Sequence, residues 1–428
     1  MDKIGKYELF RELGRGATAT VYLGRDPFAQ REVAVKVAFP DVLKNPQRGK
    51  AYSHLFLNEA SLVGKLAHPH IVQIYDAVVA ENLCYIVMEY VAGGTLEAFC
   101  TPDRRLPIER VVEIIFKCTR ALDFANRLGI THRDIKPANI LLVGANPDTA
   151  DIKISDFGAA ITGAPDRTQV SGIGSPAYMS PQQVKELPLD HQTDIYSLGV
   201  VMYQLLTGQL PFQANTSYNM IYQIINGEPL RPSALRPEIP AALDTIVARA
   251  MNKDLKQRYA NWQDFAHDLA QAFRKQPLKI PANDIADSEK FDTLSALPFF
   301  APFCDVEIWE VLHFSRWRRV PPGEVIMRDG DPGDFFCFLA AGELKVIKEG
   351  RILNLLTAGD CFGEMAVIGQ PKARRGADVV ALTGATVVSI PGDALRQASE
   401  PCRMHFYQAF LEVLTSRLTL ANARLVSP

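Results

Sequence analysis

The segment 274–290, RKQPLKIPANDIADSEK, most constrains the fold because it separates two differently patterned parts of the chain. It contains two prolines and mixed charges without a sustained apolar period, which is typical of a linker. Strand-like and helix-like stretches alternate before it. After it, glycines recur from Gly323 onward between short β-type runs such as FFCFL and ELKVI, which favours a small antiparallel barrel or roll. A length of 428 residues also predicts two or three domains.

Composition excludes several classes of protein. A net charge of −2, with 22% charged residues, indicates no nucleic-acid or polybasic membrane surface. The start, MDKIGKYELF, lacks the apolar core of a signal peptide, and the longest apolar run, near YSLGVVMYQLL, is too short for a membrane span. Seven scattered cysteines fit reduced thiols better than disulfides or a zinc site. We therefore expect a cytoplasmic protein with neither nucleic-acid nor membrane partners.

Two stretches near the N-terminus are candidates for phosphate binding. In LGRGATATVYLG, Gly14 and Gly16 lie between strand-like runs, so we expect a hairpin whose backbone N–H groups approach phosphate oxygens. In REVAVKVAF, strand alternation places Ala34 and Lys36 on one face, where the lysine suits a phosphate below a flat base. From these stretches alone, two alternatives remain: the glycines could form an ordinary turn, and the lysine could face solvent.

A carboxylate inside an apolar helical stripe strengthens this interpretation. In HLFLNEASLVGKLAHPHIV, Glu59 falls within the row made by Leu55, Phe56, Leu62, Val63 and Leu66. A buried carboxylate is costly unless it is paired. We expect Lys36 to be its partner, in a pair that would hold the lysine for the α- and β-phosphates of a nucleotide.

The motifs THRDIKPANILL and DIKISDFG then carry a family resemblance. Residues 7–273 resemble a eukaryotic-type Ser/Thr protein kinase domain, in detail its bacterial members. The resemblance implies that Asp134 is the base for the substrate hydroxyl and that Lys136 steadies the γ-phosphate. It further implies that Asn139 and Asp156 hold Mg²⁺.

The same resemblance implies an ATP site. Met88 falls at the gatekeeper position before the adenine-binding hinge at Glu89–Val91. The expected catalytic residues are Asp134, Lys136, Lys36 and Glu59. The expected ATP and metal site comprises Leu13, Gly14, Gly16, Val21, Ala34, Lys36, Met88, Glu89, Val91, Asn139, Leu141 and Asp156.

Further positions carry roles implied by the resemblance. Arg133 would receive a phosphate on the activation segment, with Thr168 and Ser171 as the nearest candidate acceptors. Ser175 would contact the catalytic Asp and Lys, and Asp194 would hydrogen-bond the backbone of the catalytic loop.

Three departures from the kinase pattern stand out. Ala19 replaces the third glycine of the glycine-rich loop. Gln182 replaces the glutamate that usually pairs with the arginine at Arg258, so we expect a neutral hydrogen bond there. Thr95 and Gln204 occupy positions where kinases that select arginine carry acids.

Residues 291–396 resemble a cyclic nucleotide-binding domain, through GEVIMRDGDPGDFFCFLAAGELKV, LTAGDCFGEMAVI and RRGADVVALT. The resemblance implies that Glu364 accepts the ribose 2′-hydroxyl and that Arg375 pairs with the cyclic phosphate. Arg374 is a second candidate, because GQPKAR is about two residues longer than in many relatives. The resemblance also implies that Gly376 favours cAMP over cGMP as the ligand. The implied ligand site comprises Phe362, Gly363, Glu364, Met365, Ala366, Arg374, Arg375 and Gly376.

Two alternatives accompany this interpretation. The fold survives in relatives that bind no nucleotide, so the domain could serve as an interaction scaffold. Arg374 to Ala377 also resemble a pseudosubstrate, which we disfavour because the following residues, ADVVAL, read as a strand and the kinase lacks the acids that would hold arginines.

The C-terminal tail carries a heptad seam beside a second apolar row. This pattern is compatible with a helix that forms a dimer and with a helix that packs on its own domain. The seam is Met404, Tyr407, Leu411, Leu414, Leu418, Ala421 and Leu425, and the second row is Phe406, Phe410, Val413 and Leu420.

The sequence thus predicts an α+β chain: a two-lobed protein kinase fold followed by a cyclic nucleotide-binding β-roll with flanking helices. We expect a kinase domain at 1–273, a linker at 274–290, the cyclic nucleotide-binding domain at 291–396 and a C-terminal helix at 397–428. The predicted function is ATP- and Mg²⁺-dependent Ser/Thr phosphorylation of proteins, regulated by cAMP or cGMP. The contrasting prediction is a pseudokinase sensor, against which the intact catalytic residues argue.

Overall fold

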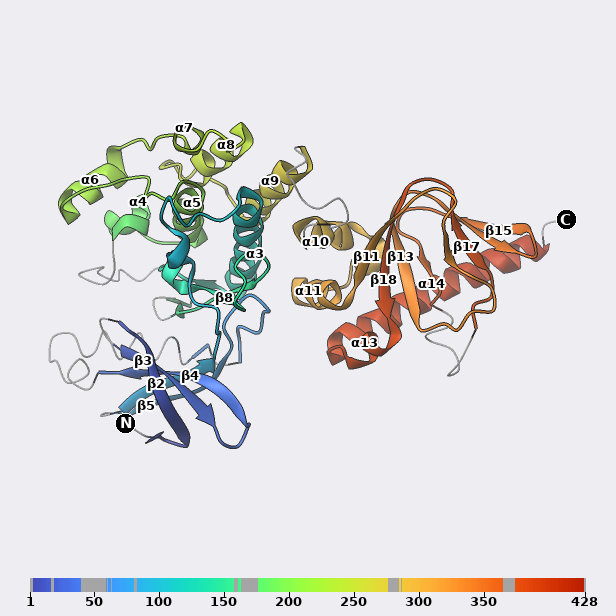
Figure 1. Ribbon diagram of the computed structural model, residues 1–428, viewed down its shortest axis with the longest axis horizontal. Coiled ribbons are helices and arrows are strands. Elements are labelled where there is room, and N and C mark those ends of the chain that lie inside the picture. Colours follow the sequence, from blue (N-terminus) through green and yellow to red (C-terminus); the bar gives the residue numbers. More distant parts are fainter. Residues whose placement is uncertain are drawn as a thin grey trace. The chain divides into compact units, whose positions relative to one another are not determined.

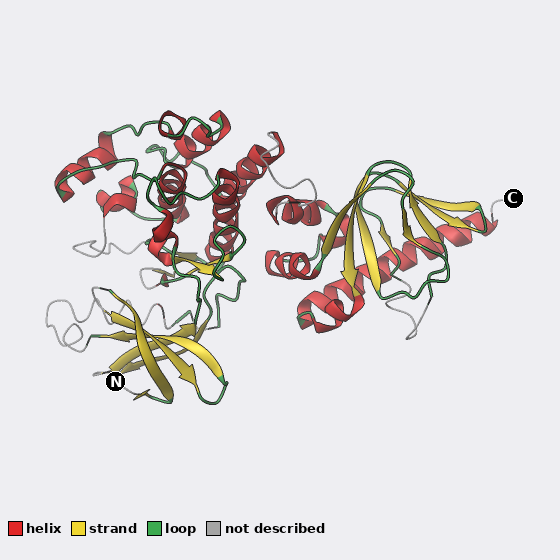
Figure 2. Cartoon of the chain, viewed as in Figure 1, coloured by secondary structure: helices red, strands yellow, loops and turns green. Residues whose placement is uncertain are grey.

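The computed structural model describes residues 3–16, 19–39, 59, 61–62, 64–80, 83–157, 161–162, 176–275, 285, 287–364 and 374–426. Contacts divide the chain into two compact units, Met1–Leu278 and Lys279–Pro428 (Figure 1). Both units combine helices and strands (Figure 2), so the predicted α+β class is confirmed. Between residues 275 and 287, the structure describes only Ile285.

The first lobe of the N-terminal unit is a six-stranded antiparallel sheet with the order β1-β2-β3-β4-β6-β5. Val33 and Val35 of β4 are fully buried and pack with Tyr7 and Val87, as the predicted strand alternation requires. The strands are β1 (Lys3–Ile4), β2 (Tyr7–Arg15), β3 (Ala19–Asp26), β4 (Arg31–Ala38), β5 (Ile74–Ala80) and β6 (Leu83–Glu89).

The second lobe is helical and is built around α5 (His191–Thr207), in which nearly every residue is buried, as in a helix at the centre of a core. The helix ends at Gly208, where φ is +76° and a Cβ would lie 2.5 Å from the backbone nitrogen of Pro102, so a glycine is required. The other helices are η1 (Leu96–Phe99), α3 (Ile108–Arg127), η2 (Pro137–Asn139), η4 (Pro176–Tyr178), α4 (Pro181–Val184), α6 (Ser217–Asn226), α7 (Pro232–Leu235), α8 (Ala241–Ala250) and α9 (Trp262–Lys275). Two strand pairs complete the lobe, β7 (Ile130–Thr131) with β10 (Ile161–Thr162), and β8 (Ile140–Val143) with β9 (Asp151–Ile154).

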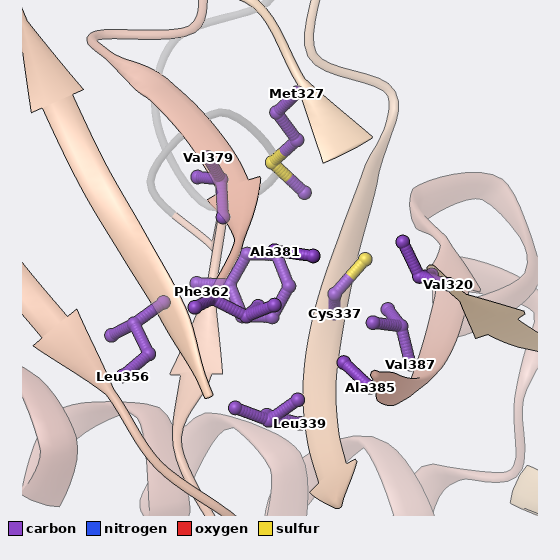
Figure 3. Packing of buried hydrophobic residues seen from close by; sticks show 11 residues of the cluster. Val320, Met327, Cys337, Leu339, Leu356, Phe362, Val379, Ala381, Ala385 and Val387 are labelled. Atoms are coloured by element: carbon purple, nitrogen blue, oxygen red, sulfur yellow. The ribbon is translucent and has the colours of Figure 1, made fainter. Parts of the chain in front are cut away.

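The C-terminal unit is a β-roll made of two four-stranded sheets, with the orders β11-β18-β13-β16 and β12-β17-β14-β15. Apolar side chains from both sheets, among them Leu339, Phe362 and Val379, form its core (Figure 3). The strands are β11 (Arg316–Val320), β12 (Val325–Met327), β13 (Phe335–Ala341), β14 (Leu344–Lys348), β15 (Arg351–Leu356), β16 (Cys361–Phe362), β17 (Asp378–Ala381) and β18 (Ala385–Pro391). Helices flank the roll: α10 (Asp287–Ala296), η5 (Pro298–Phe300), α11 (Asp305–Phe314), α13 (Gly392–Gln397) and α14 (Glu400–Val426).

Helix α14 packs on its own domain through the second of the two predicted rows. Phe406 and Phe410 are buried, and their rings lie 5.8 and 5.3 Å from that of Phe299. Within the described part of the predicted seam, Met404 and Leu411 are exposed, at 61% and 66%. Among the residues that the structure describes, no helix has the length and apolar character that crossing a membrane requires.

Candidate functional site

Lys36 lies at the centre of the first candidate site. Its Nζ donates to Glu59 Oε2 at 2.8 Å and to Asp156 Oδ1 at 2.6 Å. The predicted pairing of Lys36 with Glu59 is therefore confirmed. Burial alone would lower the pKa of Lys36, but the charges of Asp156 and Glu59 raise it above its ordinary value. The lysine charge in turn lowers the pKa of Asp156 to about 2.

Three further predicted residues meet around η2. Lys136 Nζ donates to Asp134 Oδ2 at 2.7 Å, and Asn139 Nδ2 donates to the carbonyl and to Oδ2 of Asp134, at 2.8 and 3.1 Å. The Asp134 side chain is 38% exposed, so a substrate group can reach it. Ser155, next to Asp156, donates its backbone N–H to the Asn139 carbonyl at 2.9 Å. This bond links the two halves of the predicted catalytic set.

Asp194 holds the loop that carries Asp134. Its carboxylate, at the buried N-terminal end of α5, accepts from the backbone N–H groups of His132 and Arg133, both at 2.7 Å. The hydrogen bond predicted for Asp194 is therefore confirmed. Arg133 and Asp156 adopt φ values of +69° and +65°, which cost energy in residues other than glycine and cluster at functional sites. The His132 ring packs 4.4 Å from that of Phe157.

The residues predicted to line a nucleotide site lie on neighbouring strands. Across the first sheet, Gly14 pairs with Val21, Val21 with Lys36, and Ala34 with Met88. Gly16 donates to the Ala19 carbonyl at 2.9 Å, which closes the expected hairpin. Of the remaining residues, Leu13 is on β2, Glu89 ends β6, Val91 follows it and Leu141 is on β8.

Two of the three departures are visible in the contacts. Arg258 Nη1 donates to Gln182 Oε1 at 3.2 Å, so the expected neutral hydrogen bond is confirmed. Gln204 Oε1 accepts from the Tyr178 hydroxyl at 2.7 Å. The predictions for Thr168, Ser171 and Ser175, and for Met365 and Ala366 in the second site, fall outside the described residues.

The second candidate site, which we call the cup, forms around Gly363 and Arg375. Gly363 has φ of +79°, and a Cβ there would lie 2.6 Å from Met327 Cε and 2.7 Å from Arg375 Nη1. Arg375 is buried and donates to the carbonyls of Gly363 and Phe335, at 2.9 and 2.6 Å. Burial lowers the pKa of its guanidinium. Among the described residues, no carboxylate pairs with this cation, which leaves its charge available to an anion.

Arg374 does not share this environment. It is exposed, and its Nη1 donates to the Gly330 carbonyl at 2.8 Å. Asp378–Ala381 form β17, as the prediction of a strand after the two arginines requires. A stretch with Arg375 buried and a strand immediately after it does not present an accessible pseudosubstrate.

One residue of the cup was not predicted from the sequence. Arg417 of α14 places Nη1 2.5 Å from Glu364 Oε1 and also donates to the Cys361 carbonyl. Glu364 is almost fully buried, so Arg417 supplies its counter-charge. A signal for it existed, because Arg417 continues the helical row of Phe406, Phe410 and Val413 as a lone charge in an apolar stripe.

Comparisons with known proteins match both units. The protein kinase domain model matches residues 7–271, and the cyclic nucleotide-binding domain model matches residues 317–401. The chain is 36% identical over 298 residues to serine/threonine-protein kinase PknB of Mycobacterium leprae, covering 68% of this chain and 46% of that protein. It is equally similar, over 299 residues, to PknB of Mycobacterium tuberculosis H37Rv.

A probable serine/threonine-protein kinase of Clostridium acetobutylicum is 33% identical over 288 residues, covering 67% of this chain and 41% of that protein. The chain therefore spans less than half the length of these curated relatives. Since the kinase model matches well over half of the chain and the key side chains of its motifs converge, the chain belongs to the protein kinase family, as a bacterial-type Ser/Thr kinase domain followed by a cyclic nucleotide-binding domain.

Proposed function

We propose that this chain transfers the γ-phosphate of ATP to serine or threonine hydroxyls of proteins, and that a cyclic nucleotide in the cup regulates the transfer. The observation that carries the first part is the convergence of Glu59 and Asp156 on Lys36, within 2.8 and 2.6 Å. A lysine held between two carboxylates is fixed for contact with phosphate oxygens.

Asp134 is the proposed base. Its half-exposed carboxylate can accept the proton of a substrate hydroxyl, and Lys136, 2.7 Å away, can stabilise the charge on the transferred group. Asn139 donates its amide N–H to Asp134, and within the described part of the chain its amide oxygen is left for another ligand. That oxygen and the Asp156 carboxylate form an all-oxygen donor set that fits Mg²⁺. When bound, Mg²⁺ would neutralise the phosphate charge during transfer.

The test is transfer of labelled phosphate from ATP to a generic protein substrate. We expect Asp134→Asn to abolish transfer, while Asp148→Asn, at an exposed position outside the site, leaves it unchanged. If the unchanged chain binds cyclic nucleotide but transfers no phosphate, the pseudokinase alternative holds instead.

The buried Arg375, which has no carboxylate at ion-pair distance among the described residues, supports the second part of the proposal. A buried guanidinium without a carboxylate partner favours an anion, and the Glu364 carboxylate can accept a hydroxyl of the same ligand. Because Arg417 of α14 contacts Glu364, a ligand hydroxyl there would also meet the terminal helix. Regulation follows if the ligand binds two states of the chain with different affinity.

Titration of cAMP and cGMP during kinase assays tests this part, and Gly376 favours cAMP. We expect a change in rate that is lost in Arg375→Ala and Glu364→Ala, whereas Arg374→Ala, at the exposed neighbour, retains it. No binding and no change in rate at millimolar ligand would leave the domain as a scaffold.

We further propose that the exposed seam of α14, with Met404, Tyr407 and Leu411, supports homodimers. Light scattering should show Leu411→Lys shifting the mass toward a monomer, while Leu353→Lys, at a similarly exposed position on β15, does not. A monomeric unchanged chain would refute the proposed homodimer.

We also propose a cytoplasmic location, because the seven cysteines are free thiols and the proposed reaction uses ATP.

A further inference from the structure

Backbone contacts fix the segment that directly follows the hinge between the two lobes of the kinase unit. Gly93 donates to the Leu142 carbonyl at 3.0 Å, and Leu142 donates to the Gly94 carbonyl at 2.9 Å. A side chain at Gly93 would overlap the carbonyl oxygens of Leu142 and Gly144. The chain just after the hinge therefore lies directly against strand β8.

The N-terminal end of the hinge is held by the backbone, where Glu89 donates to the Gln73 carbonyl at 2.8 Å, and in addition by a side chain. The Glu89 carboxylate accepts from Lys153 Nζ at 3.0 Å, with the same oxygen 3.3 Å from the backbone nitrogen of Gln73. The Lys153 and Glu89 side chains are 16% and 26% exposed, so solvent screens the pair only in part.

Lys153 occupies a position that connects the two ends of the proposed ATP site. It lies on β9 opposite Leu141 of β8, and its neighbours Ile152 and Ile154 are fully buried on the other face of the strand. Asp156 follows Lys153 three residues later in the chain. One ion pair thus ties the strand that ends in the hinge to the strand that leads to Asp156.

We propose that Lys153 is a positioning residue for ATP. By holding Glu89, it keeps the hinge backbone that meets adenine at a fixed separation from the phosphate end at Lys36 and Asp156. A nucleotide that must contact both ends at once binds best when their separation is set in advance. This inference rests on the proposed ATP site.

The test compares Lys153→Met with Lys153→Arg, which keeps the charge. We expect Lys153→Met to raise KM for MgATP roughly 5- to 20-fold with kcat within about twofold, as expected for lost ground-state binding. Lys153→Arg should restore most of the affinity. Glu89→Gln should resemble Lys153→Met, and the double variant should be little worse than either, because both remove one interaction. Lys6→Met, which breaks an ion pair with Asp26 away from the hinge, is the control.

A comparison of ATP with inosine triphosphate gives a second measurement, which a loss of protein stability would not change. Inosine triphosphate lacks the 6-amino group that adenine offers to the hinge, so the preference for ATP over it should narrow in Lys153→Met and stay constant in Lys6→Met. The inference is overturned if KM is unchanged, if kcat falls instead, or if the preference stays constant. A failure of the unchanged chain to transfer phosphate at all would count against the proposed function instead.

Discussion

Replacing Gln182 by glutamate should stabilise the kinase unit, because it gives a buried cation its missing counter-charge. Arg258 is 1% exposed and donates to the carbonyls of Asn252 and Gln192, at 2.7 and 2.9 Å, besides its bond to Gln182. Its Nη2 has no hydrogen-bond partner among the described residues. Burial lowers the pKa of this guanidinium to about 10, which reflects the cost of keeping it charged.

The size of the effect follows from the geometry. Glutamine and glutamate have the same shape, so the change replaces the 3.2 Å contact between the Arg258 cation and a neutral amide with an ion pair, without altering packing. At an effective dielectric constant near 20, the Coulomb attraction at this distance is about 5 kcal/mol, and burying the carboxylate cancels several kcal/mol of it. A net gain of about 1–3 kcal/mol remains, which would raise the Tm by about 2–10 °C.

Thermal unfolding of the full chain at neutral pH measures this gain. The pKa of a glutamate beside Arg258 would be lowered in the folded state, so the added stability should be present above the unfolded pKa of about 4.3 and vanish as the pH falls through the folded value. Gln204→Glu is the control, because that buried side chain contacts the Tyr178 hydroxyl instead of a cation. An unchanged or lower Tm for Gln182→Glu would contradict this prediction.

Three further outcomes are expected. Asp194→Asn should lower kcat at least 10-fold, because each carboxylate oxygen accepts one backbone N–H at 2.7 Å and the amide keeps only one of these two acceptors. Steady-state kinetics would show this loss, and an unchanged kcat would contradict it. Gly363→Ala should weaken cyclic nucleotide binding at least 10-fold by calorimetry, because its Cβ would strain the left-handed backbone and press on Arg375; wild-type affinity would argue against the cup as the binding site. Arg417→Met should weaken binding of cAMP more than that of 2′-deoxy-cAMP, because it removes the support of the Glu364 carboxylate that meets the 2′-hydroxyl; equal losses would separate Arg417 from ribose recognition.

The predictable contacts of the site were those marked by a charge in an apolar row or by a motif of the kinase resemblance. The Lys36–Glu59 pair followed from one charge in an apolar helical row, and the bonds of Asp194 and Gln182 followed from the kinase resemblance. The same row argument applied to the tail helix would have found Arg417.

The contacts of Arg375 and of Lys153 carried no such mark in the sequence. Arg375 is held by the carbonyls of Phe335 and Gly363, and every residue has a carbonyl, so no residue type marks the partner. The link between Glu89 and Lys153 joins side chains 64 positions apart in the sequence. Glu89 was predicted only as part of the hinge, and nothing in the sequence marked Lys153 as its partner. Only the folded chain brings these groups together.

The ion pair between Arg417 and Glu364 also sets where the ligand-binding unit can be cut. The family model stops matching at residue 401, but a fragment ending there would bury Glu364 without its cation. We expect the shortest fragment that folds with an intact cup to extend at least to residue 417. The C-terminal boundary of this domain is then set by an ion pair and not by its last strand.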